Sequence, residues 1–390
     1  MSFWETSIMI FPVIWISGEA LFLKKKYVSE GGGWLVLAGG CFLLSFIMVR
    51  KLSSLMGGGL VWGEVIYYGW FLFCLFAILR AFKKGLLLIL EKINFFPSSG
   101  KINQGIKKTI AFIILLLTAV PFFLVMTSIH RPKIGNIFNP QTALGLTYED
   151  VTIETRDKIK IRGWFVPAKS DSAVIIAHGL GANKSNFMGT VELWNSLGFN
   201  VLIFDFRGHG DSDGHSVSFG YKERYDVIAG MDYLVRDKKF LPSNIWGYGV
   251  SFGGAAMLYA AAEGSRFRGL IIDSAFANLD HMAEKIVTRE VIIPFFCRRL
   301  IKELGMIFLE MDLGKDIRIR SPLQAVQNLS GTPILFIHGK GDPLIPWTET
   351  ELLYKSAQAP KKLFLTDANG HYGTLEDPRY METIKGFIFN

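Results

Sequence analysis

The chain has 390 residues, of which 50% are hydrophobic, and a formal net charge of +8. Residues 1–146 contain 14 lysines and arginines against 5 aspartates and glutamates, so the positive excess lies in this half and the remainder has a net charge of −1. Because the excess of positive charge lies in the apolar half of the chain, it gives no reason to expect nucleic-acid binding. Three cysteines form no disulfide framework and seven histidines show no metal-ligand spacing, so we expect neither a metal nor a cofactor.

Residues 1–146 are predicted to form an all-α transmembrane region of about four helices. A hydrocarbon layer takes about 20 helical residues to cross. Four segments are sufficiently long and apolar: 8–23, 34–49, 60–79 and 109–128. The last contains no charged residue, whereas the first is short and contains Glu19. We therefore expect an integral, multi-pass membrane protein.

The positive charges between these segments predict its orientation. The first loop carries Lys24, Lys25 and Lys26, and the third carries seven basic residues from Arg80 to Lys108. Cytoplasmic loops are enriched in lysine and arginine, so both loops are expected in the cytoplasm. Whether or not the first segment spans the membrane, the chain after the last span is then expected on the extracytoplasmic side.

Residues 147–390 have the alternating pattern of an α/β domain. Residues 151–155 and 159–166 alternate apolar and polar side chains around a short turn, which predicts a β-hairpin. Apolar strands and helical segments then alternate to the C-terminus. We therefore predict a mostly parallel sheet with helices on both faces.

The apolar strand predicted at 201–204 leads into a segment of the form D-x-R-G-x-G-x-S. Asp205 and Arg207 in this segment are expected to be structural ion-pair and turn residues rather than catalytic ones. His209 is expected to be a loop residue rather than a base.

The segment Gly249–Gly253 fits the pattern G-x-S-x-G, with an apolar strand before it and an alanine-rich helix after it. A serine at this position can occupy a sharp, strained turn that lifts its Oγ clear of the sheet. Gly249 and Gly253 leave room for the neighbouring strand and helix. The backbone amide of Phe252 then points into an oxyanion site at the helix N-terminus. Ser251 is the predicted nucleophile.

Residues 274–332 are too many for a single crossover helix between two strands. Apolar clusters alternate there with Arg298, Arg299 and Lys302. Two interpretations remain open. The segment could be a helical lid that lines an acyl pocket, or an additional pair of helices that packs on the sheet. A lid near a bilayer would suit a lipid-like acyl substrate.

A serine hydroxyl needs a histidine to accept its proton and a carboxylate to orient that histidine. Asp342 follows the apolar strand at 333–337, and His371 follows the strand at 362–366. The carboxyl ends of parallel strands meet at one edge of the sheet, where Ser251 is also presented. We therefore predict a triad of Ser251, His371 and Asp342.

Other residues could fill two of these positions. His338 also follows a strand and is an alternative base, although a structural function is expected for it. Asp273 follows another strand and is the main alternative acid. Asp367 lies close to His371 in the sequence and is a further alternative acid.

The motifs and their order resemble those of the α/β-hydrolase superfamily, in particular its esterase and acyl-peptidase-like branch. The resemblance covers residues 147–390. It implies an α/β-hydrolase catalytic domain in which the H-G-x-G loop after strand 173–177 supplies a second oxyanion amide. That amide would be the backbone N–H of Leu180, beside that of Phe252, with Gly179 as a loop glycine.

These features together predict a membrane-anchored serine hydrolase. It would cleave an ester, thioester or amide bond in a small-molecule or lipid-like acyl substrate, through an acyl-enzyme. Two alternatives remain open. One is an acyltransferase that uses the same triad, and the other is a non-catalytic hydrolase-like membrane receptor or scaffold, which the complete triad argues against.

Overall fold

A computed structural model describes residues 101–290, 295–358 and 360–389 of the chain. The chain divides into two compact units, Met1–Phe123 and Leu124–Asn390. Three of the predicted spans lie outside the described residues, namely 8–23, 34–49 and 60–79.

The apolar segment predicted at 109–128 lies within one helix, α4 (Lys101–Ile129). Its residues Thr109–Ile129 are long and apolar enough to cross a bilayer, and no other helix among the described residues meets both conditions. Residues 101–108, which the charge pattern places in a loop, are helical and belong to α4. A membrane boundary near Thr109 is compatible with this, since basic side chains are tolerated at the ends of spans.

One eight-stranded sheet forms the centre of the second unit, in the order β1-β2-β4-β3-β5-β6-β7-β8. β1 and β2 form the predicted hairpin, β2 pairs antiparallel with β4, and the remaining pairs are parallel. The prediction of a mostly parallel sheet is therefore confirmed. The strands are β1 (Glu149–Glu154), β2 (Lys160–Val166), β3 (Ala173–Ala177), β4 (Asn200–Phe204), β5 (Ile245–Val250), β6 (Gly269–Asp273), β7 (Ile334–Gly341) and β8 (Lys361–Asn369).

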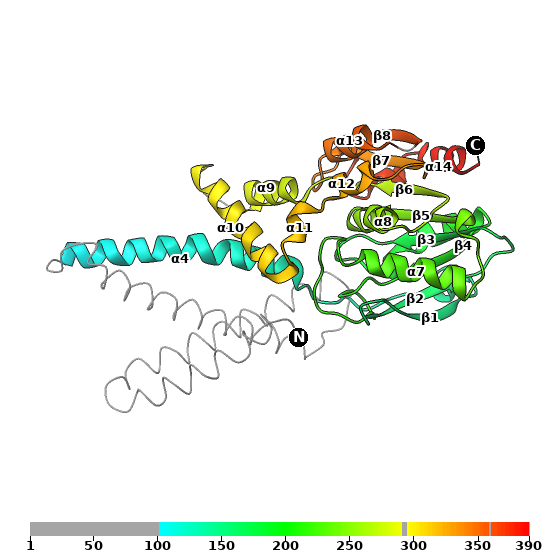
Figure 1. The fold of residues 1–390 in the computed structure, drawn as a ribbon, viewed down its shortest axis with the longest axis horizontal. Helices are drawn as coiled ribbons and strands as arrows, with labels where there is room; N and C mark the ends of the chain where they lie inside the picture. Colours follow the sequence, from blue (N-terminus) through cyan, green and yellow to red (C-terminus); the bar gives the residue numbers. More distant parts are fainter. Residues whose placement is uncertain (1–100, 291–294, 359, 390) are drawn as a thin grey trace, which may run out of the picture. The chain divides into compact units, whose positions relative to one another are not determined.

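Helices cover both faces of this sheet, as predicted (Figure 1). One face shares its apolar core with α6 (Met188–Ser196) and α14 (Tyr380–Ile388). The helices that share the core of the other face include α7 (Arg224–Arg236), α8 (Phe252–Ala262), α12 (Pro322–Gln327) and α13 (Trp347–Ser356). Short helical segments lie in the connections: α5 (Pro140–Leu144), η1 (Lys184–Phe187), η2 (Pro242–Asn244) and η3 (Gly373–Glu376).

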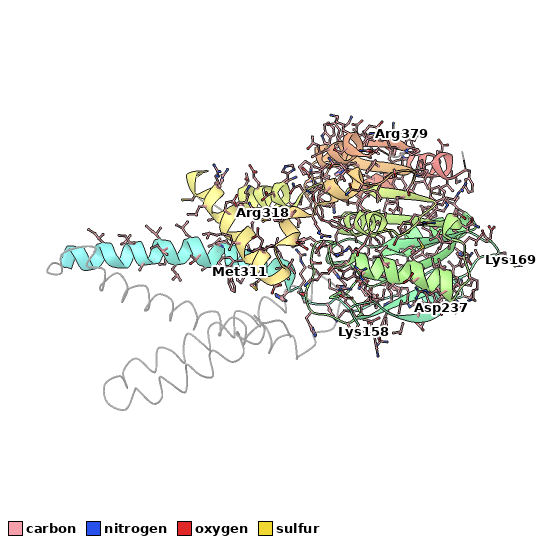
Figure 2. All side chains as sticks on the ribbon, viewed as in Figure 1. Lys158, Lys169, Asp237, Met311, Arg318 and Arg379 are labelled. Carbon is pink, nitrogen blue, oxygen red and sulfur yellow. The ribbon has the colours of Figure 1, made fainter. Side chains whose placement is uncertain are left out.

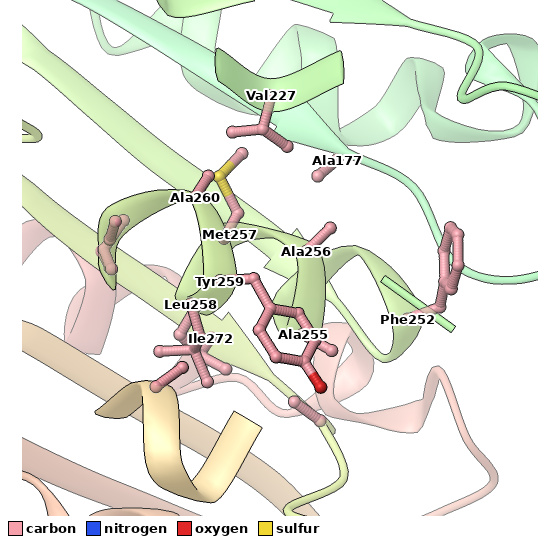
Figure 3. Packing of buried hydrophobic residues seen from close by; sticks show 14 of the residues in the cluster. Ala177, Val227, Phe252, Ala255, Ala256, Met257, Leu258, Tyr259, Ala260 and Ile272 are labelled. Carbon is pink, nitrogen blue, oxygen red and sulfur yellow. The ribbon is translucent and has the colours of Figure 1, made fainter. Parts of the chain in front are cut away.

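Alternate residues of the buried strands enter the two cores, because successive side chains of a strand point to opposite faces. In β3, Ile175 belongs to the core of α8, whereas Ile176 belongs to the core of α6. In Figure 3 the small side chains of α8 lie in the apolar core that also contains Val227 and Ile272. Small residues let α8 approach the sheet closely, and α8 is the helix that follows Ser251.

The described residues of the long segment between β6 and α12 form the helices α9 (Leu279–Glu290), α10 (Phe295–Leu313) and α11 (Asp316–Ile319). α10 buries Leu309 in the core of α8 but exposes Ile307 and Met311. Met311 is labelled in Figure 2. Arg318 on α11 binds Glu303 on α10 at 2.7 Å. The segment is helical, as expected, and its function as a lid stays a prediction.

Candidate active site

Ser251 lies in the turn between β5 and α8. Its backbone angles, φ 55° and ψ −118°, belong to a region that residues other than glycine rarely adopt. A Cβ on Gly249 would lie 2.7 Å from the backbone oxygen of Gly253, and a Cβ on Gly253 would lie 2.2 Å from that of Ala177. The turn can therefore form only with glycine on both sides of the Val250–Phe252 segment.

Backbone hydrogen bonds hold this turn in place. The Ser251 amide donates to the carbonyl of Asp273 at 2.7 Å, which ties the turn to the end of β6. The Ser251 carbonyl accepts from the Ala255 amide at 3.1 Å and so begins α8. Phe252 is the first residue of α8, where amides have no partner within the helix. The turn thus places a serine beside the positive end of a helix, which favours a developing negative charge.

His371 and Asp342 are brought together at the edge of the sheet. His371 Nδ1 lies 2.7 Å from Asp342 Oδ2. Asp342 directly follows β7, and His371 lies in the loop after β8. Because a carboxylate can only accept, Nδ1 carries the proton in this bond. When the ring is neutral, the second ring nitrogen, Nε2, carries no proton and can act as a base.

Asp342 is surrounded by hydrogen-bond donors. Its Oδ1 accepts from the amides of Leu344 at 2.7 Å and Ile345 at 3.0 Å, and its Oδ2 also faces His338 Nε2 at 3.2 Å. Burial would raise the pKa of this carboxyl. The hydrogen bonds from His338 and His371, the charge of His371 and the Ile345 amide outweigh burial and hold the pKa well below its usual range. Asp342 is therefore a carboxylate at any pH near neutrality.

His338, the alternative base, is fully buried and has both ring nitrogens occupied. Nε2 faces two acceptors, Asp342 and the Ile345 carbonyl at 3.0 Å, so this nitrogen carries a proton. Nδ1 lies 2.6 Å from the Thr350 hydroxyl. His338 is thus a donor that supports Asp342, and this support is a part of the site that the sequence did not indicate.

The turn of Ser251 and the loop of His371 meet the same segment after β3. Gly253 lies against Ala177 at the end of β3. Tyr372, next to His371, places its hydroxyl 2.5 Å from the position of a Cβ on Gly179. Among the described residues, no hydrogen bond joins the Ser251 hydroxyl to His371. Bonds of this kind are often long without substrate and shorten when it binds.

Two buried histidines shape the loop that contains Leu180. His178 Nε2 accepts from the Phe206 amide at 3.0 Å, and His209 Nε2 accepts from the Gly181 amide at 3.3 Å. Burial lowers the pKa of both rings, and for His209 burial together with His178 lowers the pKa to about 4. Neutral rings can keep accepting these amide protons. His209 is therefore a loop residue, as expected.

The alternative acids have other partners. Asp273 is 1% exposed and accepts from three hydroxyls, those of Ser274 at 2.9 Å, Thr374 at 2.8 Å and Tyr380 at 3.0 Å. Burial raises its pKa, although the three hydroxyl donors oppose this. The side chain of Asp367 is 88% exposed and lies 3.1 Å from Lys340. Neither carboxyl is hydrogen-bonded to a histidine among the described residues.

Asp205 and Arg207 each form a buried ion pair, as expected from the sequence. Asp205 Oδ2 lies 2.6 Å from Lys184 Nζ, and Arg207 lies 2.6 Å from Asp226. The two residues thus pair with separate partners rather than with each other.

Within residues 101–290, 295–358 and 360–389, no three histidine, cysteine, aspartate or glutamate side chains are grouped as metal ligands.

Comparison with known proteins identifies the family. The model of the alpha/beta hydrolase fold matches residues 172–296. The uncharacterized protein YqkD of Bacillus subtilis is 32% identical over 237 residues, which cover 59% of this chain and 75% of YqkD. The chain belongs to the alpha/beta hydrolase family.

Other relatives of this hydrolase include a membrane protein and an esterase. The uncharacterized membrane protein YNL320W of Saccharomyces cerevisiae is 27% identical over 251 residues, covering 63% of this chain and 80% of that protein. The structure of the Pyrococcus furiosus esterase Pf2001 is 26% identical with a TM-score of 0.57, covering 67% of this hydrolase and 97% of the esterase. The acetyl xylan esterase of Paenibacillus sp. R4 shares the fold at 19% identity and a TM-score of 0.50. The match covers 70% of this chain and 94% of that esterase.

Proposed function

We propose that this alpha/beta hydrolase is a membrane-anchored serine hydrolase that cleaves an ester, thioester or amide bond. The observation that carries the proposal is the 2.7 Å hydrogen bond between His371 Nδ1 and Asp342. It leaves His371 Nε2 as a base at the sheet edge where the strained turn presents Ser251.

The reaction would proceed through an acyl-enzyme. Ser251 Oγ attacks the substrate carbonyl while its proton passes to His371 Nε2, and ionised Asp342 stabilises the resulting imidazolium. The tetrahedral intermediate then collapses, and His371 delivers the proton to the leaving oxygen, sulfur or nitrogen. Water attacks the acyl-enzyme in the second half, with His371 again accepting a proton, and Ser251 is released with the acid product.

The negative charge of the tetrahedral intermediates would be bound by two backbone amides. Phe252 offers its amide at the start of α8, and Leu180 offers its amide in the loop that the two neutral histidines hold. Fixed donors of this kind need no reorganisation during the reaction, and loss of one typically costs about 10²–10³-fold in kcat.

An ester is the first substrate class to test, because the similar solved structures include the esterase Pf2001. We further propose a lipid-like acyl group, since α4 is apolar enough to hold the hydrolase at a bilayer. A series of p-nitrophenyl esters of increasing acyl length tests this. Rising kcat/KM with acyl length supports a lipid-like substrate, whereas a maximum at acetate indicates a small soluble one.

The proposed membrane attachment is supported by α4 and by the yeast relative named as a membrane protein. We propose residues 1–146 as a multi-pass transmembrane region and residues 147–390 as the catalytic domain. The charge pattern of the loops supports an extracytoplasmic catalytic domain.

Labelling of Ser251 by a fluorophosphonate tests the nucleophile. Intact cells and lysates are treated with a membrane-impermeant probe, for the native chain, Ser251→Ala and Ser274→Ala. Ser274 is a matched control, because it is also buried with a positive φ of 51° but binds Asp273. We expect labelling of the native chain and of Ser274→Ala, and none of Ser251→Ala. Labelling after lysis alone would reverse the orientation, and no labelling in either sample would favour a non-catalytic receptor or scaffold.

A further inference from the structure

Residues 130–137, called the connector below, follow α4 and lead toward α5. The connector binds the loop after β3 through Asn183, which is 1% exposed. Asn183 Nδ2 donates to the backbone oxygens of Ile134 at 2.9 Å and Gly135 at 3.0 Å. Its Oδ1 accepts from both the amide and the hydroxyl of Ser185. One amide side chain thus uses both donors to hold the connector and its acceptor to hold the loop.

A buried charge cluster forms a second attachment. Lys184 is 2% exposed, and its Nζ lies 2.6 Å from Asp205 and 2.9 Å from Asp211. Asn136 of the connector donates to the same two carboxylates, at 3.1 Å and 2.6 Å. Lys133 of the connector also donates to the carbonyl of Ser212. A lysine this deeply buried is stable only while its carboxylate partners stay in place, so the cluster resists displacement.

The connector is also fixed at its two ends. Ile129, the last residue of α4, has no exposed surface, and its carbonyl accepts from the Val217 amide at 3.0 Å. The amide of Ile137 donates to the Ser185 hydroxyl at 3.3 Å. The segment that leaves α4 is therefore bound along its length to the loops after β3 and β4.

We propose that the connector is a structural support of the oxyanion loop, and that Asn183 is a positioning residue for the Leu180 amide. This inference rests on the proposed function, in which that amide binds the oxyanion. Leu180 lies within a turn closed by the Ala182 amide and the Gly179 carbonyl at 3.2 Å, and Asn183 follows the turn directly. A displacement of Asn183 would therefore move the turn that carries the donor.

Displacement of this turn would slow catalysis, because oxyanion donors act over a narrow range of distance. A donor must lie about 2.7–3.1 Å from the developing oxyanion, and a misplacement of about 1 Å can cost roughly 10²-fold in rate. The segment through which the hydrolase is joined to its apolar helix thus helps to set the rate of the reaction.

Asn183→Asp in the full-length protein tests the first attachment. The substitution keeps the shape and the acceptor toward Ser185, but places an oxygen opposite the carbonyls of Ile134 and Gly135. We expect kcat for a p-nitrophenyl ester to fall about 10- to 100-fold, with KM changed less than about 3-fold. Asn136→Ala removes part of the second attachment but leaves the lysine paired, and we expect a smaller loss of kcat, about 3- to 10-fold.

Asn139→Ala is the matched control for a merely structural effect. Asn139 lies just after the connector and caps α5 by accepting from the Thr142 amide at 2.8 Å. Loss of a cap lowers Tm by roughly 2–4 °C, yet in the described part of the chain no hydrogen bond joins the Asn139 side chain to the loop after β3. We expect kcat and KM of this variant to stay within about 2-fold of the native values.

Hydrogen exchange of the peptide that covers residues 178–187 provides a readout that does not depend on activity. Faster exchange of this peptide in Asn183→Asp and Asn136→Ala, but not in Asn139→Ala, together with the kcat losses, supports the proposal. Unchanged exchange and unchanged kcat in the first two variants overturn it, as does a kcat loss in all three variants that follows Tm. If the native protein is neither active nor labelled by the fluorophosphonate, the proposed function fails. The exchange result then still decides whether the connector supports the loop.

Discussion

Two aspartates at neighbouring strand ends, Asp273 as the last residue of β6 and Asp342 directly after β7, have opposite electrostatic environments. Asp342 accepts from two backbone amides and two imidazoles, and its pKa is held well below the usual range despite burial. Asp273 is more deeply buried and accepts from three hydroxyls, and its pKa is raised. The two residues have the same side chain and the same type of position in the sheet.

The contrast shows that the kind of donor, and not only the number of hydrogen bonds, affects the direction in which the pKa of a buried carboxyl moves. Imidazole and amide N–H groups can only donate, so they favour a carboxylate. A hydroxyl can also accept, so the three hydroxyls around Asp273 are compatible with a neutral carboxyl, and burial then determines its pKa. Asp273 joins η3, through Thr374, to the end of β6 and so holds the loop of His371.

The largest effect is expected when the charge of Asp342 is removed. The asparagine side chain is neutral and its Nδ2 can only donate, so Asp342→Asn removes the charge that stabilises the imidazolium of His371 and favours the wrong tautomer of that ring. We expect kcat for an ester to fall about 10⁴-fold, with little change of fold. Steady-state kinetics measures kcat, and circular dichroism measures the change of fold. A loss below about 10-fold would contradict the assignment of Asp342 as the acid.

A smaller effect is expected from the donor that supports Asp342. His338→Leu removes the Nε2 proton that faces the carboxylate at 3.2 Å. We expect kcat to fall about 10-fold, because a hydrogen bond to a charged group contributes about 1.5–3 kcal/mol. We also expect the acidic limb of the pH–kcat/KM profile to move to higher pH, because the carboxylate, once it lacks the His338 donor, attracts the proton on the base more strongly. His338→Gln retains an N–H donor and should recover part of the loss. A profile that is identical in all three proteins would argue against this function of His338.

Asp273→Asn is expected to reduce kcat less than Asp342→Asn or His338→Leu. The amide oxygen can accept from Thr374 and Tyr380 in place of the carboxyl. We expect kcat within about 3-fold of the native value and a decrease in Tm of a few degrees, from a loss of about 1 kcal/mol. Kinetics and thermal unfolding test this. A kcat loss as large as that of Asp342→Asn would make Asp273 the better candidate for the acid.

The pH dependence of stability should have opposite signs for the two carboxyls. The lowered pKa of Asp342 stabilises the fold above the ordinary aspartate pKa of about 3.9, and this contribution is lost as the pH falls through the folded pKa. The raised pKa of Asp273 stabilises the fold below the ordinary value, and this contribution is lost as the pH rises to the folded pKa. The Tm difference from the native protein should therefore shrink toward low pH for Asp342→Asn and toward higher pH for Asp273→Asn. The same trend in both variants would refute the contrast.

Local patterns in the sequence determined much of this protein. The apolar run at 109–128 predicted a helix, and the alternation of strands and helices predicted the mostly parallel sheet. Ser251, Asp342 and His371 could be proposed from their order and from their positions after strands, because parallel strands end at one edge. These inferences depend on a few consecutive residues or on a regular alternation, and both are visible in a linear chain.

The hydrogen bonds between side chains and loops that are far apart in the sequence are visible only in the folded protein. Asn183 binds carbonyls 49 and 48 positions earlier, His209 binds an amide 28 positions earlier, and Asp273 binds Thr374 across 101 positions. Such pairings have no sequence period, since they arise when loops from different strand ends fold over one another. Burial, and therefore the direction of each pKa shift, is likewise a property of the packed molecule. For this reason the sequence could suggest candidate residues for the site, while the fold decided which carboxyl has its pKa lowered, which has it raised, and which segments hold the loop in place.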